Sequence, residues 1–132
     1  MRKLNQNDSR QTALALAEEA NQHKALDVRI LDVSKLCGYA DFFILLSGAS
    51  NRQTRALADK ILDKAGFSPN SAEGYTKGDW ILLDLSDIVV HVFHEPIRKI
   101  YNLDKLWGDA PIVSENGSRQ KTDDPLTKPS SV

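Results

Sequence analysis

The stretch ADFFILLSGASNRQTRALADKILDKAG, residues 40–66, decides the fold, because an apolar segment leads directly into a helical pattern. Residues 40–48 are almost continuously apolar, which predicts a central strand that is covered on both faces. Over residues 51–65, Ala, Leu and Ile recur at helical spacing among polar residues, which predicts an amphipathic helix. A buried strand followed by such a helix is typical of an α/β domain.

The ends of this helix carry their own signals. Ser50 with Gln53 three residues later has the form of a capping box. In that motif the Ser50 hydroxyl accepts from the Gln53 backbone, and the Gln53 side chain returns to the Ser50 backbone. Gly66 can take the left-handed conformation that closes a helix. The buried stripe of the helix is expected to comprise Ala56, Leu57, Ile61 and Leu62.

The residues before this stretch predict a helix and a second strand. Residues 8–25 are rich in Ala, Leu and Glu, and either Asp8 or Ser9 is suited to cap their helix. Residues 26–34 alternate between apolar and polar positions, as a half-exposed strand does. Because they run almost directly into residues 40–48, we expect the two strands to pair antiparallel. One face of the earlier strand is expected to present Val28 and Ile30, and the other Leu31 and Val33.

Residues 73–95 predict two more strands, which are joined at the sequence DLSD. If Leu85 and Ser86 form the turn, Trp80 lies opposite His91, although Leu-Ser is a poor pair for a tight type I′ turn. A register shift of two residues would keep each side chain on its face. The face expected to pack under helices comprises Ile81, Leu83, Ile88, Val90 and Val92, and the other, mixed face comprises Trp80, Leu82, Asp84, Val89, His91 and Phe93.

A last helix is expected from Pro96, a residue that suits a first helical turn. Residues 109–132 hold few apolar anchors among Pro, Ser, Asn, Lys and Asp, so we expect a disordered tail there. Residues 1–7 are polar and are expected to be flexible. The segment between them, residues 8–108, predicts a single α/β domain with a mixed β-sheet and flanking helices.

The composition limits the classes of protein to which the chain can belong. Its 132 residues suffice for one domain with a core, and 41% hydrophobic and 27% charged residues are an ordinary mixture. The net charge of −1 gives no basic excess for phosphates, so we expect no recognition of a specific nucleic-acid sequence. Cys37 is the one cysteine, which fits a reducing compartment. No apolar run is long enough to span a membrane, and we expect a cytoplasmic protein.

The histidines and carboxylates lack the spacing of a metal site. His91 and His94 lie three residues apart on a predicted strand, so their side chains point to opposite faces. No cluster of Cys or carboxylate residues has the spacing of ligands, so we expect no metal and no cofactor. His91 is instead expected to be a surface residue beside Trp80.

The Gly-Ser turn in LLSGASNRQ, residues 45–53, raises the alternative of an enzyme. A strand, such a turn and a helix N-terminus can bind phosphate, and nucleotidyltransferases have a Gly and a Ser at this place. Those enzymes also need two carboxylates one residue apart to hold metal ions, whereas Asp84 and Asp87 are three apart. The ending of a P-loop is absent as well. A well-capped helix is therefore favoured over a nucleotidyltransferase-type enzyme, and we expect no catalytic residues.

The stretch YNLDKLWGDAP, residues 101–111, places bulky apolar side chains where the chain turns polar. Together with the mixed strand face, they either complete the core or remain available to a partner, because aromatic residues dominate protein-binding hot spots. From the pattern alone both readings stay open. A homodimeric adaptor that associates through this face is a further alternative.

The segments ADFFILLSGASNRQTRALADKI and EGYTKGDWILLDLSDIVVHVFHEPIRKIYNLDKLWGDAP resemble the ribosomal silencing factor family, also called Iojap-like. The resemblance covers about residues 13–111. The sequence departs from the family's pattern at the DLSD turn, at Phe42 and at Asp104, where an aromatic with Gly, Tyr and Glu respectively are common. The residues that carry the resemblance are Ala40, Asp41, Ser47, Gly48, Ser50, Gln53, Glu73, Gly74, Trp80, Asp84, Val90, His91, Val92, Phe93, Arg98, Tyr101, Leu106, Trp107, Asp109, Ala110 and Pro111.

The resemblance implies a nucleotidyltransferase-like fold without enzymatic activity. It implies binding to the large ribosomal subunit through a ribosomal protein on its subunit-joining face, the fourteenth of the large-subunit series. The bound factor would block the small subunit sterically and so repress translation when nutrients are scarce. The residues expected to bind the partner are Trp80, Asp84, His91, Phe93, Arg98, Tyr101, Leu106, Trp107 and Asp109.

Two finer expectations concern this surface. Tyr101 and Leu106 are expected to pack against the sheet edge, with Trp107 flanking the contact surface. A ribosomal protein is typically basic, so acidic groups around an aromatic centre would complement it. The acidic groups expected in this role are Asp84, Asp87 and Asp109.

Overall fold

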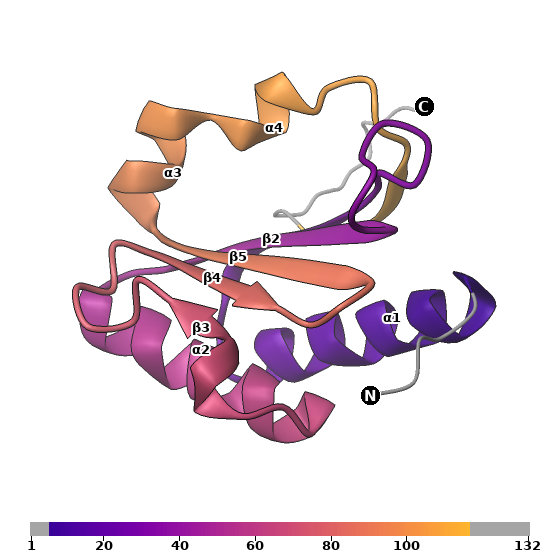
Figure 1. The fold of residues 1–132 in the computed structure, drawn as a ribbon. Helices are drawn as coiled ribbons and strands as arrows, with labels where there is room; N and C mark the ends of the chain where they lie inside the picture. Colours follow the sequence, from indigo (N-terminus) through magenta and orange to yellow (C-terminus); the bar gives the residue numbers. More distant parts are fainter. Residues whose placement is uncertain (1–5, 117–132) are drawn as a thin grey trace.

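The computed structural model, which describes residues 6–116, contains a six-stranded mixed sheet with helices on both faces (Figure 1). The strand order is β3-β4-β5-β2-β1-β6, and β2 and β5 form a parallel pair. Helices α1 and α2 cover one face, and the short helices α3 and α4 lie over the other. This arrangement confirms the predicted fold class. The elements are α1 Gln6–Gln22, β1 Leu26–Asp32, β2 Phe42–Gly48, α2 Asn51–Ala65, a 3₁₀ turn Pro69–Ser71, β3 Ala72–Glu73, β4 Trp80–Asp84, β5 Ile88–His94, α3 Glu95–Tyr101, α4 Leu103–Leu106 and β6 Ile112–Asn116.

Helix α2 spans the predicted residues Asn51–Ala65. The Ser50 hydroxyl accepts from the Gln53 N–H at 3.1 Å, and Gly66 takes the left-handed conformation at φ 75°. The Gln53 side chain does not return to Ser50, because its Oε1 accepts from the N–H of Ala49 at 2.7 Å. The cap is confirmed, and its reciprocal contact lies one residue earlier than predicted. The stripe also differs in part: Ala56 is exposed, and the buried residues are Thr54, Leu57, Ala58, Ile61 and Leu62.

Helix α1 lies two to three residues earlier in the chain than predicted, at Gln6–Gln22. It ends there because Lys24 takes a left-handed conformation at φ 68°. The residues expected to cap its start lie inside the helix instead. Ser9 is fully buried, and its hydroxyl donates to Asp87 Oδ2 at 3.2 Å, which joins α1 to the β4–β5 turn.

Strands β1 and β2 pair antiparallel, and every residue of β2 is buried, as the sequence predicts. The alternation along β1 is also confirmed. Val28 and Ile30 belong to the core beneath α1 and α2, whereas Leu31 and Val33 belong to the core on the opposite face. β1 is therefore an inner strand that contributes to the cores on both faces, which corrects the expectation of a half-exposed strand.

The β4–β5 hairpin has a register that differs by two residues from the predicted one. Trp80 lies opposite Phe93 rather than His91, because the turn is formed by Ser86 and Asp87. The N–H of Leu85 donates to the carbonyl of Ile88 at 2.9 Å, and Ser86 has φ 74°. A shift of two preserves the faces. The five aliphatic residues predicted to pack under helices all lie in the core beneath α1 and α2.

Strand β6, Ile112–Asn116, corrects the expectation that the chain is disordered from residue 109. It pairs antiparallel with β1, and Val113 packs against the core. Backbone pairing and one apolar contact are enough to form an edge strand. Neither can be predicted from the amino-acid composition of the segment. Most of the predicted tail, residues 117–132, lies outside the described residues, as do residues 1–5 of the segment expected to be flexible.

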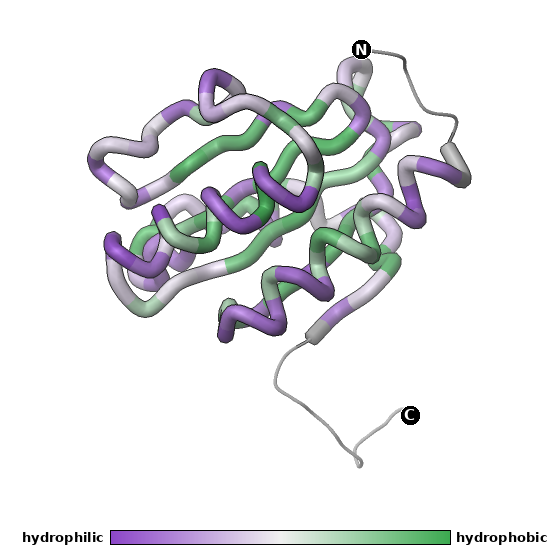
Figure 2. Tube along the Cα trace, turned by 90° about the horizontal axis from the view of Figure 1, so that it is seen from below, coloured by the Kyte–Doolittle hydropathy of each residue, from purple (hydrophilic) through white to green (hydrophobic). Residues whose placement is uncertain are grey.

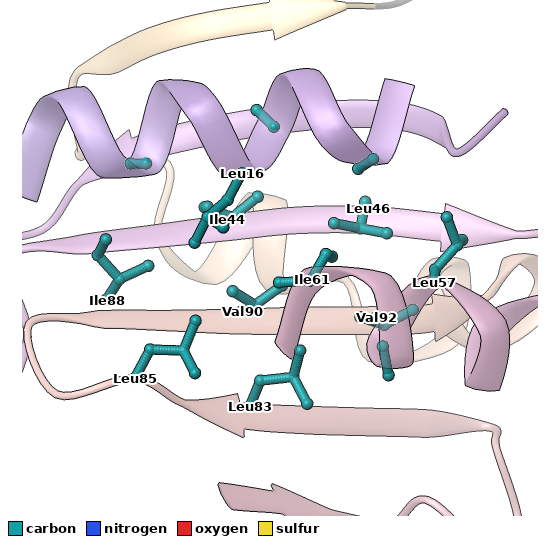
Figure 3. Packing of buried hydrophobic residues seen from close by; sticks show 14 of the residues in the cluster. Leu16, Ile44, Leu46, Leu57, Ile61, Leu83, Leu85, Ile88, Val90 and Val92 are labelled. Carbon is teal, nitrogen blue, oxygen red and sulfur yellow. The ribbon is translucent and has the colours of Figure 1, made fainter. Parts of the chain in front are cut away.

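Two hydrophobic cores lie on opposite faces of the sheet. The larger lies between the sheet and α1 with α2, where Ile44, Val90 and Val92 meet Leu16 and Ile61 (Figure 3). Figure 2, seen from below, shows hydrophobic residues along the central strands and hydrophilic ones along the outer sides of these helices. The smaller core lies on the face with α3 and α4, and its aromatic side chains are Phe43, Phe93, Trp80 and Trp107.

Candidate partner-binding surface

Aromatic side chains on β4 and β5 form a connected array on the sheet face that carries α3 and α4. The ring of Trp80 lies 5.0 Å from that of Phe93 and 4.9 Å from that of Tyr101, measured between centroids. Phe43 on β2 lies 5.1 Å from Trp107. The alternative that these side chains complete a core is therefore confirmed for several rings, and their availability to a partner stays a prediction.

His91 is buried at the centre of this array. It is 5% exposed, and its Nδ1 accepts from Trp80 Nε1 at 3.2 Å. Burial lowers the pKa of His91 from 6.5 to about 4, so the ring is neutral at neutral pH. The expected position beside Trp80 is correct, but the expected surface position is wrong, because the rings of Phe43, Trp80 and Phe93 surround His91.

The outer side of α3 and α4 exposes large apolar side chains. Ile100 is 72% exposed, Tyr101 58% and Leu106 73%. We call these three residues, with the half-buried Trp80 that contacts the Tyr101 ring, the α3–α4 surface. Exposed apolar groups gathered on short elements are typical of a contact surface for another macromolecule.

The predicted positions of Leu106 and Trp107 are exchanged in the structure. Asn102 takes a left-handed conformation at φ 52° and separates α3 from α4. Through this break, α4 buries Leu103 and turns Leu106 to solvent. Trp107 is half-buried against Phe43. The expectation that Leu106 packs against the sheet edge is therefore wrong. Tyr101 contacts the sheet only through the ring of Trp80.

Charged groups around this face differ in their accessibility. Asp84 and Asp109 are exposed, whereas Asp87 is 7% exposed and accepts a hydrogen bond from α1. Asp87 is thus engaged within the protein, contrary to the expected role at a partner. Lys99 and Lys105 are exposed on α3 and α4, so both signs of charge lie on these helices and the turn after them.

The nine residues predicted to bind a partner divide into two groups. Arg98 is 9% exposed and pairs with Asp104, whose carboxylate accepts from Arg98 Nε at 3.1 Å and from Nη2 at 3.0 Å. Ile100 is an exposed residue that sequence reasoning missed, although it occupies a regular helical position beside Tyr101. Trp80, Asp84, Tyr101, Leu106, Trp107 and Asp109 are exposed or half-buried, and His91, Phe93 and Arg98 are buried.

The Gly-Ser turn before α2 is occupied by its own side chains. Gln53 Oε1 takes the Ala49 N–H, and Ser50 Oγ takes the Gln53 N–H. A Cβ on Gly48 would lie 3.1 Å from a side-chain carbon of Thr54, so the turn is closely packed against the helix. Within residues 6–116, no group of three His, Cys, Asp or Glu side chains could hold a metal ion. No helix in this part of the chain is long and apolar enough to cross a membrane.

These features define a small α/β protein that presents an apolar surface beside a buried aromatic core. The chain belongs to the ribosomal silencing factor family, since the family model described as "Ribosomal silencing factor during starvation" matches residues 6–131. It is similar to the ribosomal silencing factor of Halalkalibacterium halodurans, with 42% identity over 113 residues that cover 83% of this chain and 97% of that protein. The factor of Bacillus subtilis is 41% identical over 100 residues, which cover 74% and 85%.

Solved structures agree with this assignment. A crystal structure of a Chromobacterium violaceum protein superposes with a TM-score of 0.67 and 34% sequence identity, and the match covers 90% of this chain and 96% of that one. The family predicted from sequence is thus confirmed, and its name associates the chain with the ribosome and the regulation of translation.

Proposed function

We propose that this chain binds the large ribosomal subunit on its subunit-joining face and sterically prevents the small subunit from joining. The partner would be the fourteenth protein of the large-subunit series. Such a factor would repress translation under nutrient limitation and would work in the cytoplasm, where ribosomes assemble. Its family relatives are named for silencing rather than for a reaction, which supports a regulatory and non-enzymatic role.

The observation that carries the proposal is the α3–α4 surface. Three apolar side chains, each more than half exposed, lie on helices of seven and four residues. Their removal from water would stabilise a complex by about 25 cal/mol for each Å² of apolar area. Trp80 and Tyr101 add ring edges and a hydroxyl, a combination that is enriched at binding hot spots.

Steric occlusion needs no chemistry beyond binding. A chain of this length has a radius of gyration of roughly 14 Å, so it occupies a substantial part of any surface on which it docks. Two subunits that meet face to face leave no room for a folded body of that size. The proposal therefore requires only an adequate affinity and the right location.

The test is co-sedimentation with separated ribosomal subunits, followed by an assay of subunit joining. We expect the protein to travel with the large subunit alone and to inhibit joining. Tyr101→Ala should weaken both effects, whereas Tyr75→Ala serves as the matched control, because Tyr75 is an exposed tyrosine that contacts Asp59 on α2. Absence from the large-subunit fraction, or binding without inhibition, would refute the proposal.

A homodimer is the second candidate, because the same exposed apolar side chains could bind a second copy of the chain. Its mass measured at micromolar and at dilute concentrations distinguishes the two. A dimer that Tyr101→Ala dissociates, in a protein that ignores large subunits, would favour self-association as the function. A dimer that also inhibits subunit joining would instead indicate that the dimer dissociates before the chain binds the large subunit.

A further inference from the structure

A carboxylate on α4 joins arginines from two other elements. Asp104 Oδ2 accepts from Arg98 Nε at 3.1 Å, and its Oδ1 accepts from Arg98 Nη2 at 3.0 Å. Arg29 Nη1 on β1 lies 3.1 Å from the same Oδ1. We call Arg29, Arg98 and Asp104 the Asp104 clasp. Paired contacts between a guanidinium and a carboxylate fix orientation as well as distance, so the clasp sets how α4 lies relative to α3 and β1.

The remaining nitrogen of Arg98 holds α3 to the sheet. Arg98 Nη1 donates to the carbonyl of Asp27 at 2.7 Å and to Ser47 Oγ on β2 at 3.1 Å. Asp27 has φ 50° and lies in the register shift between Leu26 and Arg29 of the β1–β2 pairing. This irregularity makes the Asp27 carbonyl available to Arg98. One side chain on α3 therefore contacts α4, β1 and β2.

The clasp lies on the inner side of the corner whose outer side is the α3–α4 surface. Helices of seven and four residues are too short to be stable alone, although Asn102 between them caps both through its backbone and side chain. On the inner side, Arg98 and Leu103 are buried. On the outer side, Ile100 and Leu106 are largely exposed, and the ring of Tyr101 also contacts Trp80. The orientation of those exposed groups thus depends on what holds the inner side.

The protonation state of Asp104 favours the clasp. Burial alone would raise the pKa of this carboxyl, but the hydrogen bonds and charge of Arg98, and the charge of Arg29, outweigh burial and lower the pKa below its ordinary value. Arg29 also pairs with Glu115 on β6. The side chain of Arg98 is 10% exposed and that of Asp104 21%, so solvent weakens the contacts only in part.

We propose that Arg98 and Asp104 are positioning residues, which fix the α3–α4 corner so that the α3–α4 surface is presented in a single arrangement. The inference rests on the proposed function, because it takes that surface to be the one that contacts the large subunit. Arg98 then acts through the corner from a buried position. A buried arginine would then affect binding without touching the partner.

The test compares Asp104→Asn with Asp63→Asn, which removes an exposed carboxylate from α2. Loss of a charge-assisted hydrogen bond at a partly buried site is expected to weaken large-subunit binding by about tenfold or more in Asp104→Asn. Amides of α3 and α4 should exchange hydrogen faster in the free variant, while those of α1 and α2 exchange as in the wild type. The control should match the wild type in both measurements.

Arg98→Lys keeps the positive charge but loses the two-pronged contact with Asp104. It serves as a second, milder variant in case Asp104→Asn fails to fold. Intermediate binding and intermediate exchange in this variant would support positioning. Wild-type binding and exchange in both variants would overturn it. If the wild-type protein itself fails to bind large subunits, the proposed function fails. The exchange measurement, which needs no partner, then still supports the clasp or overturns it.

Discussion

Replacing Leu106 by Ala is expected to leave the fold nearly as stable as before, whereas replacing Leu103 should destabilise it strongly. The two leucines lie in the same four-residue helix, but Leu103 is 8% exposed and Leu106 73%. Each substitution removes three carbons, worth about 0.8 kcal/mol each when fully buried. Scaled by burial, the loss is about 2 kcal/mol at Leu103, with a further contribution from the cavity, and about 0.6 kcal/mol at Leu106.

Urea denaturation followed by circular dichroism measures both free energies of unfolding. Binding to separated large subunits should be weaker in Leu106→Ala than in the wild type, although the variant remains folded. Equal destabilisation by the two substitutions would mean that α4 does not turn at Asn102 as described. Unchanged binding by a stable Leu106→Ala protein would remove Leu106 from the contact surface, and the same result with Tyr101→Ala would remove the surface itself.

Three further predictions use other parts of the molecule. Burial lowers the pKa of His91 from 6.5 to about 4, so the unfolded chain binds a proton first as the pH falls. Protonation of His91 in the unfolded chain should therefore lower the free energy of unfolding by roughly 3 kcal/mol between pH 7 and pH 4. In His91→Gln the free energy of unfolding, measured by denaturation across that pH range, should fall by less. Gly74→Ala should destabilise by more than about 1 kcal/mol, because Gly74 has φ 81° and a Cβ there would lie 2.3 Å from the carbonyl oxygen of Trp80. Gly38→Ala, which meets no atom within 4 Å, is its control, and equal thermal midpoints for the two would contradict the reasoning. Nucleotide with Mg²⁺ should leave the melting temperature unchanged, and a rise that saturates with nucleotide concentration would instead favour a nucleotidyltransferase-type enzyme.

Sequence reasoning succeeded where the signals are local. The cap at Ser50 and the left-handed Gly66 define α2 from residues within one turn of its ends. The alternation in β4 and β5 predicted the correct faces even though the turn was displaced, because a register error of two residues leaves the side-chain directions unchanged. These features depend on a few neighbouring residues, so they can be predicted from local sequence patterns.

The features that escaped sequence reasoning depend on contacts between distant segments. β6 exists because β1 offers an unpaired edge, and the composition of residues 109–132 carries no sign of that edge. The placement of Leu106 follows from the left-handed Asn102, and helical spacing continued through that residue predicts the wrong side. The sequence predicts Arg98 to contact a partner, whereas its hydrogen-bond acceptors on β1 and β2, which lie 71 and 51 residues away in the chain, cannot be inferred from local patterns.

The two faces of the sheet separate stability from binding. Helices of 17 and 15 residues cover one face and enclose a core of mostly aliphatic side chains. Helices of only seven and four residues cover the other, so its aromatic rings complete the smaller core while Tyr101 remains more than half exposed. A surface built in this way can expose apolar groups without relying on them for folding, because most of the buried hydrophobic residues belong to the larger core. Its weak point is the orientation of the short helices, and the Asp104 clasp supplies directional contacts at that point, where non-directional apolar packing is sparse.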